Sequence, residues 1–228
     1  MNRFITFLCI IIIWTCKEKA TLPFSSHTAS DSIINSTIKE EKIMDDDSNL
    51  HDRTIWQRPY EIISMLGPLE DKIIADIGAG SGYFSFKFIH TAKKVIAIDI
   101  DKELIDLMNE EKNYYKEEIN SKFEARLAKP YDPMLNKDEV DVVFLSNTYC
   151  YLTNRVSYLS NLKKCFKPKG RIMIVDFKKK ITPIGPNLNI RLAQGEVEKE
   201  LIDAGYRIEI SDDSKLEYQY IIIASPID

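Results

Sequence analysis

The sequence predicts an α/β protein of three layers, in which helices cover a seven-stranded, mostly parallel sheet that ends in an antiparallel hairpin. Three observations carry this prediction. From residue 73 onward, short runs rich in β-branched residues alternate with amphipathic segments, which is typical of parallel strands covered by helices. A glycine-rich turn directly follows the first of these runs. The last two runs are separated only by a short loop, so we expect them to pair as a hairpin.

The expected strands are short, and helices fill the gaps between them. Strands are predicted at residues 72–77, 94–99, 122–127, 141–146, 171–177, 207–211 and 218–224. Helices are predicted at residues 54–66, 82–90, 102–120, 154–166 and 195–204. Two boundaries carry residues that end helices and begin turns, namely Lys167-Pro168-Lys169-Gly170 and Ala204-Gly205-Tyr206.

Length and composition limit the number of domains and the class of partner. A chain of 228 residues is long enough for one ordinary domain with short appendages. The net charge of −4 gives no global electrostatic case for binding nucleic acid. Cys9, Cys16, Cys150 and Cys165 form no CxxC pair and accompany no histidine cluster. We therefore expect neither a disulfide framework nor a zinc site.

The N-terminus has the features of an export signal. Arg3 provides a positive charge, and residues 4–15 form a mostly apolar run of the length found in signal sequences, whereas a membrane-spanning helix needs roughly 20 residues. The run ends at Cys16, and residues 1–16 resemble a bacterial lipoprotein signal. That resemblance implies that Cys16 is lipidated and anchors the protein to the cell membrane on the exported side. An uncleaved anchor and a buried helix are the alternatives.

A change of composition separates this segment from the predicted domain. Residues 17–50 are mostly polar, rich in Ser, Thr, Asn and Asp over much of their length, and lack sustained apolar periodicity. We expect them to form a flexible polar tether. The domain itself is expected to occupy residues 51–228.

A glycine-rich loop follows the first predicted strand. Residues 76–82 read Asp-Ile-Gly-Ala-Gly-Ser-Gly. Glycine lets the backbone turn sharply and approach a ligand, and the start of the following helix offers unpaired N–H groups. The G-x-G-x-G spacing differs from the G-x-G-x-x-G of nicotinamide-dinucleotide sites. A nicotinamide-dependent oxidoreductase is therefore disfavoured, and a tight turn without a ligand is the remaining structural alternative.

An acid ends the second predicted strand. Asp99 lies 17 residues beyond Gly82, where a carboxylate with two acceptor oxygens is placed to accept both hydroxyls of a ribose. Ile100 would then pack against the adenine. The alternative role of Asp99 is a helix N-cap, but Asp101 fits that role better.

These features resemble the class I S-adenosylmethionine-dependent methyltransferases, and the likeness extends from about residue 56 to residue 226. The chain is similar to bacterial methyltransferase-domain proteins and, more loosely, to the ubiquinone and menaquinone biosynthesis methyltransferases. The segments that carry the likeness are Trp56-Gln57-Arg58-Pro59 and residues 76–85, 97–101, 141–149, 162–171 and 174–177. The resemblance implies a Rossmann-like fold and an enzyme that transfers a methyl group to a small-molecule acceptor.

The resemblance also implies a set of residues that bind S-adenosylmethionine. Asp76 would hold its amino end, Asp132 would contact the adenine amine, and Ser146 would face the transferred methyl group. The full predicted set is Asp76, Gly78, Ala79, Gly80, Gly82, Asp99, Ile100, Asp132 and Ser146. No metal is expected.

No general base is predicted. Relatives often read Tyr-His-His after the fourth strand, where this chain reads Tyr149-Cys150-Tyr151. In-line attack on an activated methyl group can be accelerated largely by holding donor and acceptor together in a desolvated pocket. Trp56, Tyr83, Tyr149 and Tyr151 are candidate walls of that pocket and equally candidates for ordinary core.

The predicted export signal raises an alternative function. S-adenosylmethionine is made in the cytoplasm, so an exported enzyme would lack a known supply. The alternative is an exported, non-catalytic module that keeps the fold in order to bind a ligand or a partner. The intact Asp76, Gly78, Gly80 and Asp99 argue against decay of the site.

Overall fold

The computed structural model describes residues 50–227, and it confirms the predicted fold. Seven strands form one sheet in the order β3-β2-β1-β4-β5-β7-β6. Their bounds are β1 Ile73–Ile77, β2 Lys94–Asp99, β3 Phe123–Leu127, β4 Val140–Ser146, β5 Phe166–Phe177, β6 Tyr206–Asp212 and β7 Gln219–Pro226. The neighbouring strands β3, β2, β1, β4 and β5 are parallel to one another, whereas β7 runs antiparallel to both β5 and β6. The predicted signal at residues 1–16, with Cys16, and nearly all of the predicted tether lie outside the described residues.

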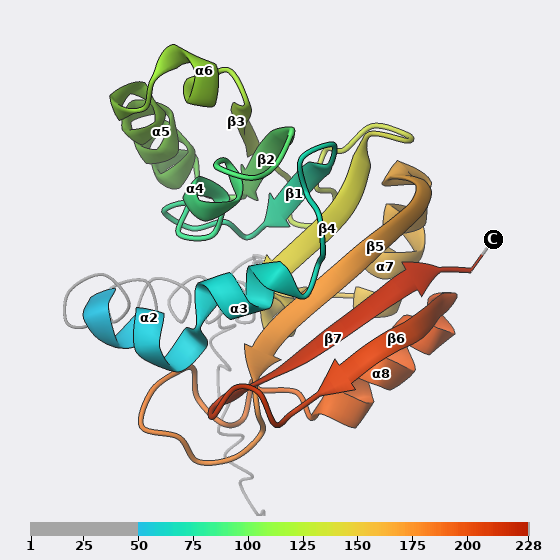
Figure 1. The fold of residues 1–228 in the computed structure, drawn as a ribbon. Coiled ribbons are helices and arrows are strands. Elements are labelled where there is room, and N and C mark those ends of the chain that lie inside the picture. The colour runs from blue at the N-terminus through green and yellow to red at the C-terminus, as the bar shows by residue number, and fades with distance from the viewer. Residues whose placement is uncertain (1–49, 228) are drawn as a thin grey trace, which may run out of the picture.

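Helices cover both faces of the sheet (Figure 1). Their bounds are α2 Leu50–Gln57, α3 Pro59–Ser64, α4 Ser85–Phe88, α5 Lys102–Glu111, α6 Glu117–Asn120, α7 Arg155–Leu162 and α8 Gln194–Asp203. Short 3-10 turns occupy Lys112–Tyr114, Tyr149–Tyr151 and Lys163–Cys165. Within residues 50–227, no helix has both the length and the apolar character needed to cross a membrane.

Each face of the sheet has its own buried apolar cluster. Ile62 of α3 and Phe88 of α4 pack with strand residues on one face, and Leu159 of α7 and Leu201 of α8 do so on the other. Strands that are buried on both faces must be apolar at nearly every position, which explains the continuous apolar runs of the sequence. Buried polar side chains occur instead at or next to the carboxyl ends of β1, β2, β4 and β5, where they are Asp76, Asp99, Ser146 and Asp176.

The strand order reverses between β1 and β4, because β2 and β3 extend to one side and β5 to the other. In open parallel sheets, ligands bind beyond the carboxyl ends of the strands at such a reversal. In Figure 1 these ends lie at the lower side of the sheet, together with α2 and the loop that follows β5. A ligand site is therefore expected at this edge of the sheet.

The structure differs from the prediction mainly at helix boundaries. The helix expected at residues 54–66 is interrupted at Arg58, which has a left-handed φ of 48°. The cause is Pro59, because proline disfavours helical geometry in the residue before it and is favoured at the first position of a new helix. The helix expected at residues 102–120 ends at Glu111, and the extended Tyr115 stacks on Phe86 with ring centroids 5.3 Å apart.

The fifth strand begins earlier than expected. β5 starts at Phe166 rather than at Arg171, and its pairing with β4 is irregular between these two residues. Lys169 has a φ of 66°. The residues expected to form a turn after the helix therefore form a bulge inside the strand.

Candidate functional site

The glycine loop between β1 and α4 has a backbone that only glycine adopts easily. Gly78, Gly80 and Gly82 have φ values of 74°, 59° and 89°, a region in which other L-residues are strained. The N–H groups of Gly78 and Ala79 donate to the carbonyl oxygen of Ile98 at 2.8 and 3.0 Å, which ties the loop to β2. The predicted role of these glycines in shaping a tight loop thus has a geometric basis.

The three glycines differ in what surrounds them. A Cβ atom at Gly78 would collide with Thr148, and one at Gly82 would collide with the ring of Phe86. A Cβ atom at Gly80 would meet nothing within 4 Å. Gly80 is therefore the point of the loop where a ligand can lie directly against the backbone.

Asp99 is bound to the glycine loop. Its Oδ2 accepts from the N–H of Gly80 at 2.9 Å and its Oδ1 from the N–H of Asp101 at 3.0 Å. Asp101, rather than Asp99, caps α5 by accepting from the N–H of Glu103 at 2.9 Å. The carboxylate of Asp99 therefore joins the end of β2 to the glycine loop and to the start of α5.

An apolar pair lies at the ends of the two neighbouring strands. Ile100 follows β2 and Leu127 ends β3, which is paired with β2 at Asp99. Both side chains are 47% exposed. Half-exposed aliphatic side chains at a strand edge offer a surface for a flat ring, and the packing of Ile100 against an adenine stays a prediction. The sequence did not indicate Leu127, because the strand that it ends reads Phe-Glu-Ala-Arg-Leu and is not continuously apolar.

Asp76 is a buried acid next to this loop. Its side chain is 2% exposed and accepts from the hydroxyl of Ser85 at 2.6 Å. Burial raises the pKa of Asp76 to about 7, and the negative charge of Asp99 adds to this, whereas Ser85 and Arg53 oppose it. A cationic group of a ligand would favour the ionised form, because opposite charges lower the pKa of an acid.

Helix α2 is fixed to the same edge by polar contacts. Gln57 is fully buried, donates from Nε2 to the hydroxyl of Ser146 at 2.9 Å, and accepts from Nε of Arg53 at 2.7 Å. The guanidinium of Arg53 and the ammonium of Lys87 lie over the ring of Tyr83, at 4.0 and 3.6 Å from its centroid. Sequence reasoning missed Arg53 and Gln57, although their spacing of four residues places them on one helix face.

The residues after β4 hold Ser146 beside the glycine loop. Ser146 is 9% exposed. The hydroxyl of Thr148 donates to the carbonyl oxygens of Ser146 and Gly78 at 3.0 and 3.3 Å. The structure therefore brings Ser146 together with the loop and makes Gln57 the partner of its hydroxyl, while its position facing the methyl group stays a prediction.

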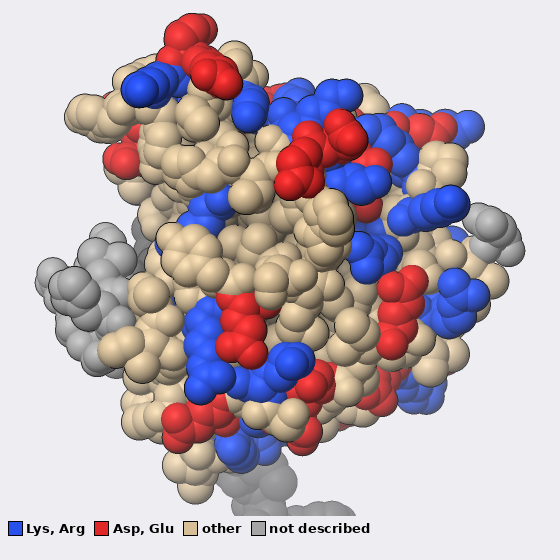
Figure 2. Space-filling view, in the orientation of Figure 1, with Lys and Arg blue, Asp and Glu red and all other residues tan. Residues whose placement is uncertain are grey.

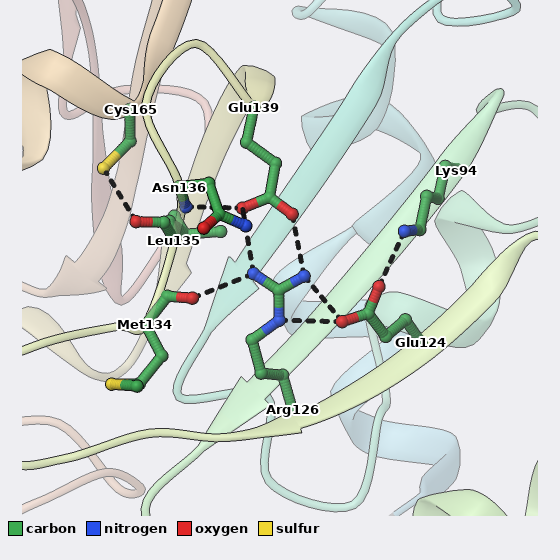
Figure 3. Close-up of polar contacts among 8 residues, drawn as sticks. All are labelled: Lys94, Glu124, Arg126, Met134, Leu135, Asn136, Glu139 and Cys165. Atoms are coloured by element: carbon green, nitrogen blue, oxygen red, sulfur yellow. Dashed lines mark hydrogen bonds and ion pairs between the residues drawn. The ribbon is translucent and has the colours of Figure 1, made fainter.

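Asp132 lies in a separate loop between β3 and β4. It is exposed, and its Oδ1 accepts from the N–H of Met134 at 2.8 Å. Figure 3 shows how this loop is held, with Arg126 of β3 donating to the carbonyl oxygen of Met134 and to the carboxylate of Glu139. The hydrogen bonds of Asp132 stay within its own loop, so its contact with an adenine amine stays a prediction.

Two of the aromatic residues predicted as pocket walls, Tyr149 and Trp56, have different surroundings. Tyr149 is fully buried and donates to Glu200 at 2.7 Å, which also pairs with Arg155, so it joins the helices α7 and α8 to the core. Trp56 packs against Phe177 at the edge of the sheet, with ring centroids 5.6 Å apart.

A second buried acid, Asp176, was also missed. It accepts from the N–H groups of Cys150 at 3.1 Å and Phe177 at 2.8 Å. Burial raises the pKa of Asp176 to about 6, although these hydrogen bonds by themselves lower it. The carboxylate thereby fixes the turn after β4 to the end of β5. Neither Cys150 nor Cys165 forms a disulfide.

A family model and several known proteins match this chain. Residues 69–219 match the model of a family described as a methyltransferase domain. The tRNA U34 carboxymethyltransferase of Ruthia magnifica subsp. Calyptogena magnifica is 29% identical over 143 residues, which cover 60% of this chain and 43% of that protein. Phosphoethanolamine N-methyltransferase 1 of Arabidopsis thaliana is 28% identical over 109 residues, covering 48% of this chain and 21% of that protein. The chain therefore spans less than half the length of these curated relatives.

A solved structure shares the fold over nearly its whole length. It is a SAM-dependent methyltransferase from Aquifex aeolicus, which superposes with a TM-score of 0.72 at 23% identity. The match covers 84% of this chain and 97% of that chain.

Proposed function

Because the chain belongs to the methyltransferase-domain family, we propose that it transfers a methyl group from S-adenosylmethionine to a small-molecule acceptor. The observation that carries the proposal is the hydrogen bond between Asp99 and the N–H of Gly80. It joins the acid at the end of β2 to the one glycine of the loop that faces open space, at the edge where the strand order reverses.

The adenosine half of the donor fits the residues at the ends of β2 and β3. Gly80 leaves room for a sugar against the backbone, and a carboxylate such as that of Asp99 is suited to the hydroxyl groups of a ribose. Ile100 and Leu127 offer an apolar surface to the adenine. Asp132 is proposed as the partner of the adenine amine.

The amino acid half of the donor fits the opposite charges beside β1. Asp76 is suited to an ammonium group and Arg53 to a carboxylate. When bound, the donor's sulfonium supplies a methyl group that its positive charge already activates. The chain's own contribution is to orient the two substrates and to exclude water from them.

Binding experiments test the donor assignment directly. Calorimetry of the full chain should show heat with S-adenosylmethionine and none with NADH. Asp99→Ala should weaken donor binding by about tenfold or more, since a hydrogen bond to a charged group contributes roughly 1.5–3 kcal/mol. Asp106→Ala, an exposed acid on α5, is the matched control and should bind normally. The absence of heat with S-adenosylmethionine at saturating concentration would refute the proposal.

A small molecule is favoured over nucleic acid as the acceptor. The net charge is −4, and Figure 2 shows Lys and Arg interspersed with Asp and Glu over the visible face, without a broad basic tract. Phosphate backbones are bound by clustered basic residues.

The apolar N-terminal run that ends at Cys16 supports an anchored, exported location. Cys16→Ser should release the protein from the membrane fraction if the lipid anchor exists. The same run favours a second candidate function, a non-catalytic binding module. Such a module would bind S-adenosylmethionine or another ligand without forming S-adenosylhomocysteine with any acceptor.

A further inference from the structure

Three aromatic rings gather at the carboxyl edge of the sheet. Trp56 of α2 lies 5.6 Å from Phe177 at the end of β5 and 6.3 Å from Tyr218 before β7, centroid to centroid. Phe177 is buried, whereas Trp56 and Tyr218 are half-buried. The rings are tilted by 39° and 49° rather than stacked. The two half-buried rings therefore have surface left for a ligand.

A buried amide lies on the same face of the sheet. Gln219 pairs directly with Phe177 across β5 and β7, so the two side chains share a face. Its Nε2 donates to Oδ1 of Asn147 at 2.5 Å. The side chain is 1% exposed, and among residues 50–227 no group donates to its Oε1. A buried acceptor without a donor is unfavourable, so a ligand's N–H would be a natural partner.

The three aromatic rings and the Gln219 amide lie beside the proposed donor site, because two of the residues involved are sequence neighbours of donor-site residues. Trp56 precedes Gln57, which bonds to the hydroxyl of Ser146, and Asn147 follows Ser146. The aromatic rings and the amide therefore continue the edge that holds the glycine loop. A molecule bound there would lie next to the methyl donor.

We propose that Trp56, Asn147, Phe177, Tyr218 and Gln219 form the acceptor subsite and that it takes a small amine. The proposal rests on the methyl-transfer function proposed above. An amine donates a hydrogen bond to Gln219 Oε1, and aromatic faces stabilise the positive charge that methylation places on nitrogen. A hydroxyl group can also donate, but its methylated product is neutral and gains nothing from the rings.

The transfer is balanced without a further reactant. The amine nitrogen forms a bond to the methyl carbon through its lone pair, while the carbon–sulfur bond breaks and its electron pair stays on sulfur. The methylated nitrogen then carries the positive charge, and its extra proton leaves to water. Only the unprotonated amine has the lone pair, so the rate should rise with pH through the amine's own pKa.

The first test is a competition between matched acceptors, followed by mass spectrometry and by formation of S-adenosylhomocysteine. The full chain is offered ethanolamine, phosphoethanolamine, ethylene glycol and catechol. We expect an N-methylated product from at least one of the two amines and none from ethylene glycol or catechol. Methylation of the glycol or of catechol without methylation of either amine would overturn the amine assignment and leave methyl transfer intact. No product from any probe, together with no heat for S-adenosylmethionine, would overturn the proposed function itself.

The second test asks whether Gln219 selects the amine. Gln219→Met should raise the KM for the amine by about tenfold and leave the calorimetric affinity for S-adenosylmethionine within about twofold. Gln219→Glu keeps an acceptor at the same place and should retain amine binding, which covers the case in which the methionine variant does not fold. Tyr114→Leu removes an exposed tyrosine far from the site in the sequence and is the control. An unchanged KM in a folded Gln219→Met variant would overturn the assignment.

Fluorescence gives a readout that does not depend on turnover. The sequence has two tryptophans, Trp14 and Trp56. In a Trp14→Phe background saturated with S-adenosylhomocysteine, an amine that binds the subsite should change the emission of Trp56. The change should saturate at the amine concentration that also saturates turnover. A flat titration with an amine that is nevertheless methylated would place the acceptor elsewhere.

Discussion

Replacing Arg126 with methionine removes the cation that joins β3 to the loop before β4. Its guanidinium donates to both oxygens of Glu139 at 2.8 and 2.9 Å and to the carbonyl oxygen of Met134 at 3.0 Å (Figure 3). The side chains of Arg126 and Glu139 are each 16% exposed. Removing one partner of a buried pair costs about 3–5 kcal/mol. Because this pair keeps some contact with water, we expect the free energy of unfolding to fall by about 2–3 kcal/mol.

Urea unfolding at neutral pH measures this loss, provided that the m-value is unchanged. Glu139→Gln and the double variant complete a cycle, whose coupling energy should be about 1 kcal/mol or more. Lys102→Met is the control, because its ion pair with Asp106 is exposed and should contribute less than about 0.5 kcal/mol. If Arg126→Met costs no more than this control, the inferred strength of the pair is wrong.

The same pair predicts a dependence on pH. Hydrogen bonds from Arg126 hold the pKa of Glu139 at about 2, below its ordinary value of 4.5. A lowered pKa means that the fold favours the ionised acid, so the stabilisation is complete above the ordinary value and is lost as the pH falls from 4.5 toward about 2. The difference in stability between the wild-type protein and Arg126→Met should therefore narrow over that range, and an equal difference at neutral and acid pH would contradict the assignment.

Three further changes test the donor site and the loop after β5. Burial raises the pKa of Asp76 to about 7, so the calorimetric affinity for S-adenosylmethionine should increase as the pH rises through that value, by at most about tenfold per pH unit. Asp76→Asn should remove this pH dependence. A wild-type affinity that does not vary with pH would argue against an ion pair between Asp76 and the donor. Gly80→Ala forces alanine to a φ of 59°, which should lower the free energy of unfolding measured in urea by roughly 1–2 kcal/mol. The added methyl group should also weaken donor binding. Normal donor binding by the folded variant would show that no ligand lies against Gly80. Arg191→Met removes five hydrogen bonds from the guanidinium to oxygen atoms of the loop after β5 and should cost more than about 2 kcal/mol in urea. A loss as small as that of Lys102→Met would show that the arginine does not organise the loop.

The glycine loop and Asp99 could be predicted from the sequence because their signals are local. Gly80 and Asp99 are 19 residues apart, within a single strand–helix–strand unit whose geometry is well defined. The break at Arg58 was equally local, since Pro59 follows it, but the apolar periodicity of the segment concealed it. A proline inside a helical pattern ends or kinks the helix at the preceding residue, whatever the apolar periodicity of the segment.

The contacts of α2 and of β7 could not be predicted in the same way. The bond from Gln57 to Ser146 joins residues that are 89 positions apart, and the bond from Gln219 to Asn147 joins residues 72 apart. Neither residue type indicates its partner, because glutamine is mostly a surface residue. Only the order of the strands brings these side chains to one edge, and that order is a property of the whole sheet.

The proposed pairing of Arg53 with the donor's carboxylate would couple the docking of α2 to the binding of the donor. An eight-residue helix is not stable by itself in water, and α2 is held by the bond from Gln57 to Ser146 and by the ring contacts of Trp56. A ligand whose carboxylate pairs with Arg53 binds the docked helix better than the undocked one, so it must shift α2 toward the docked position. By reciprocity, a change that loosens α2 must weaken the ligand by the same factor. Because Trp56 also belongs to the proposed acceptor subsite, the same helix would link occupation of that subsite to occupation of the donor site.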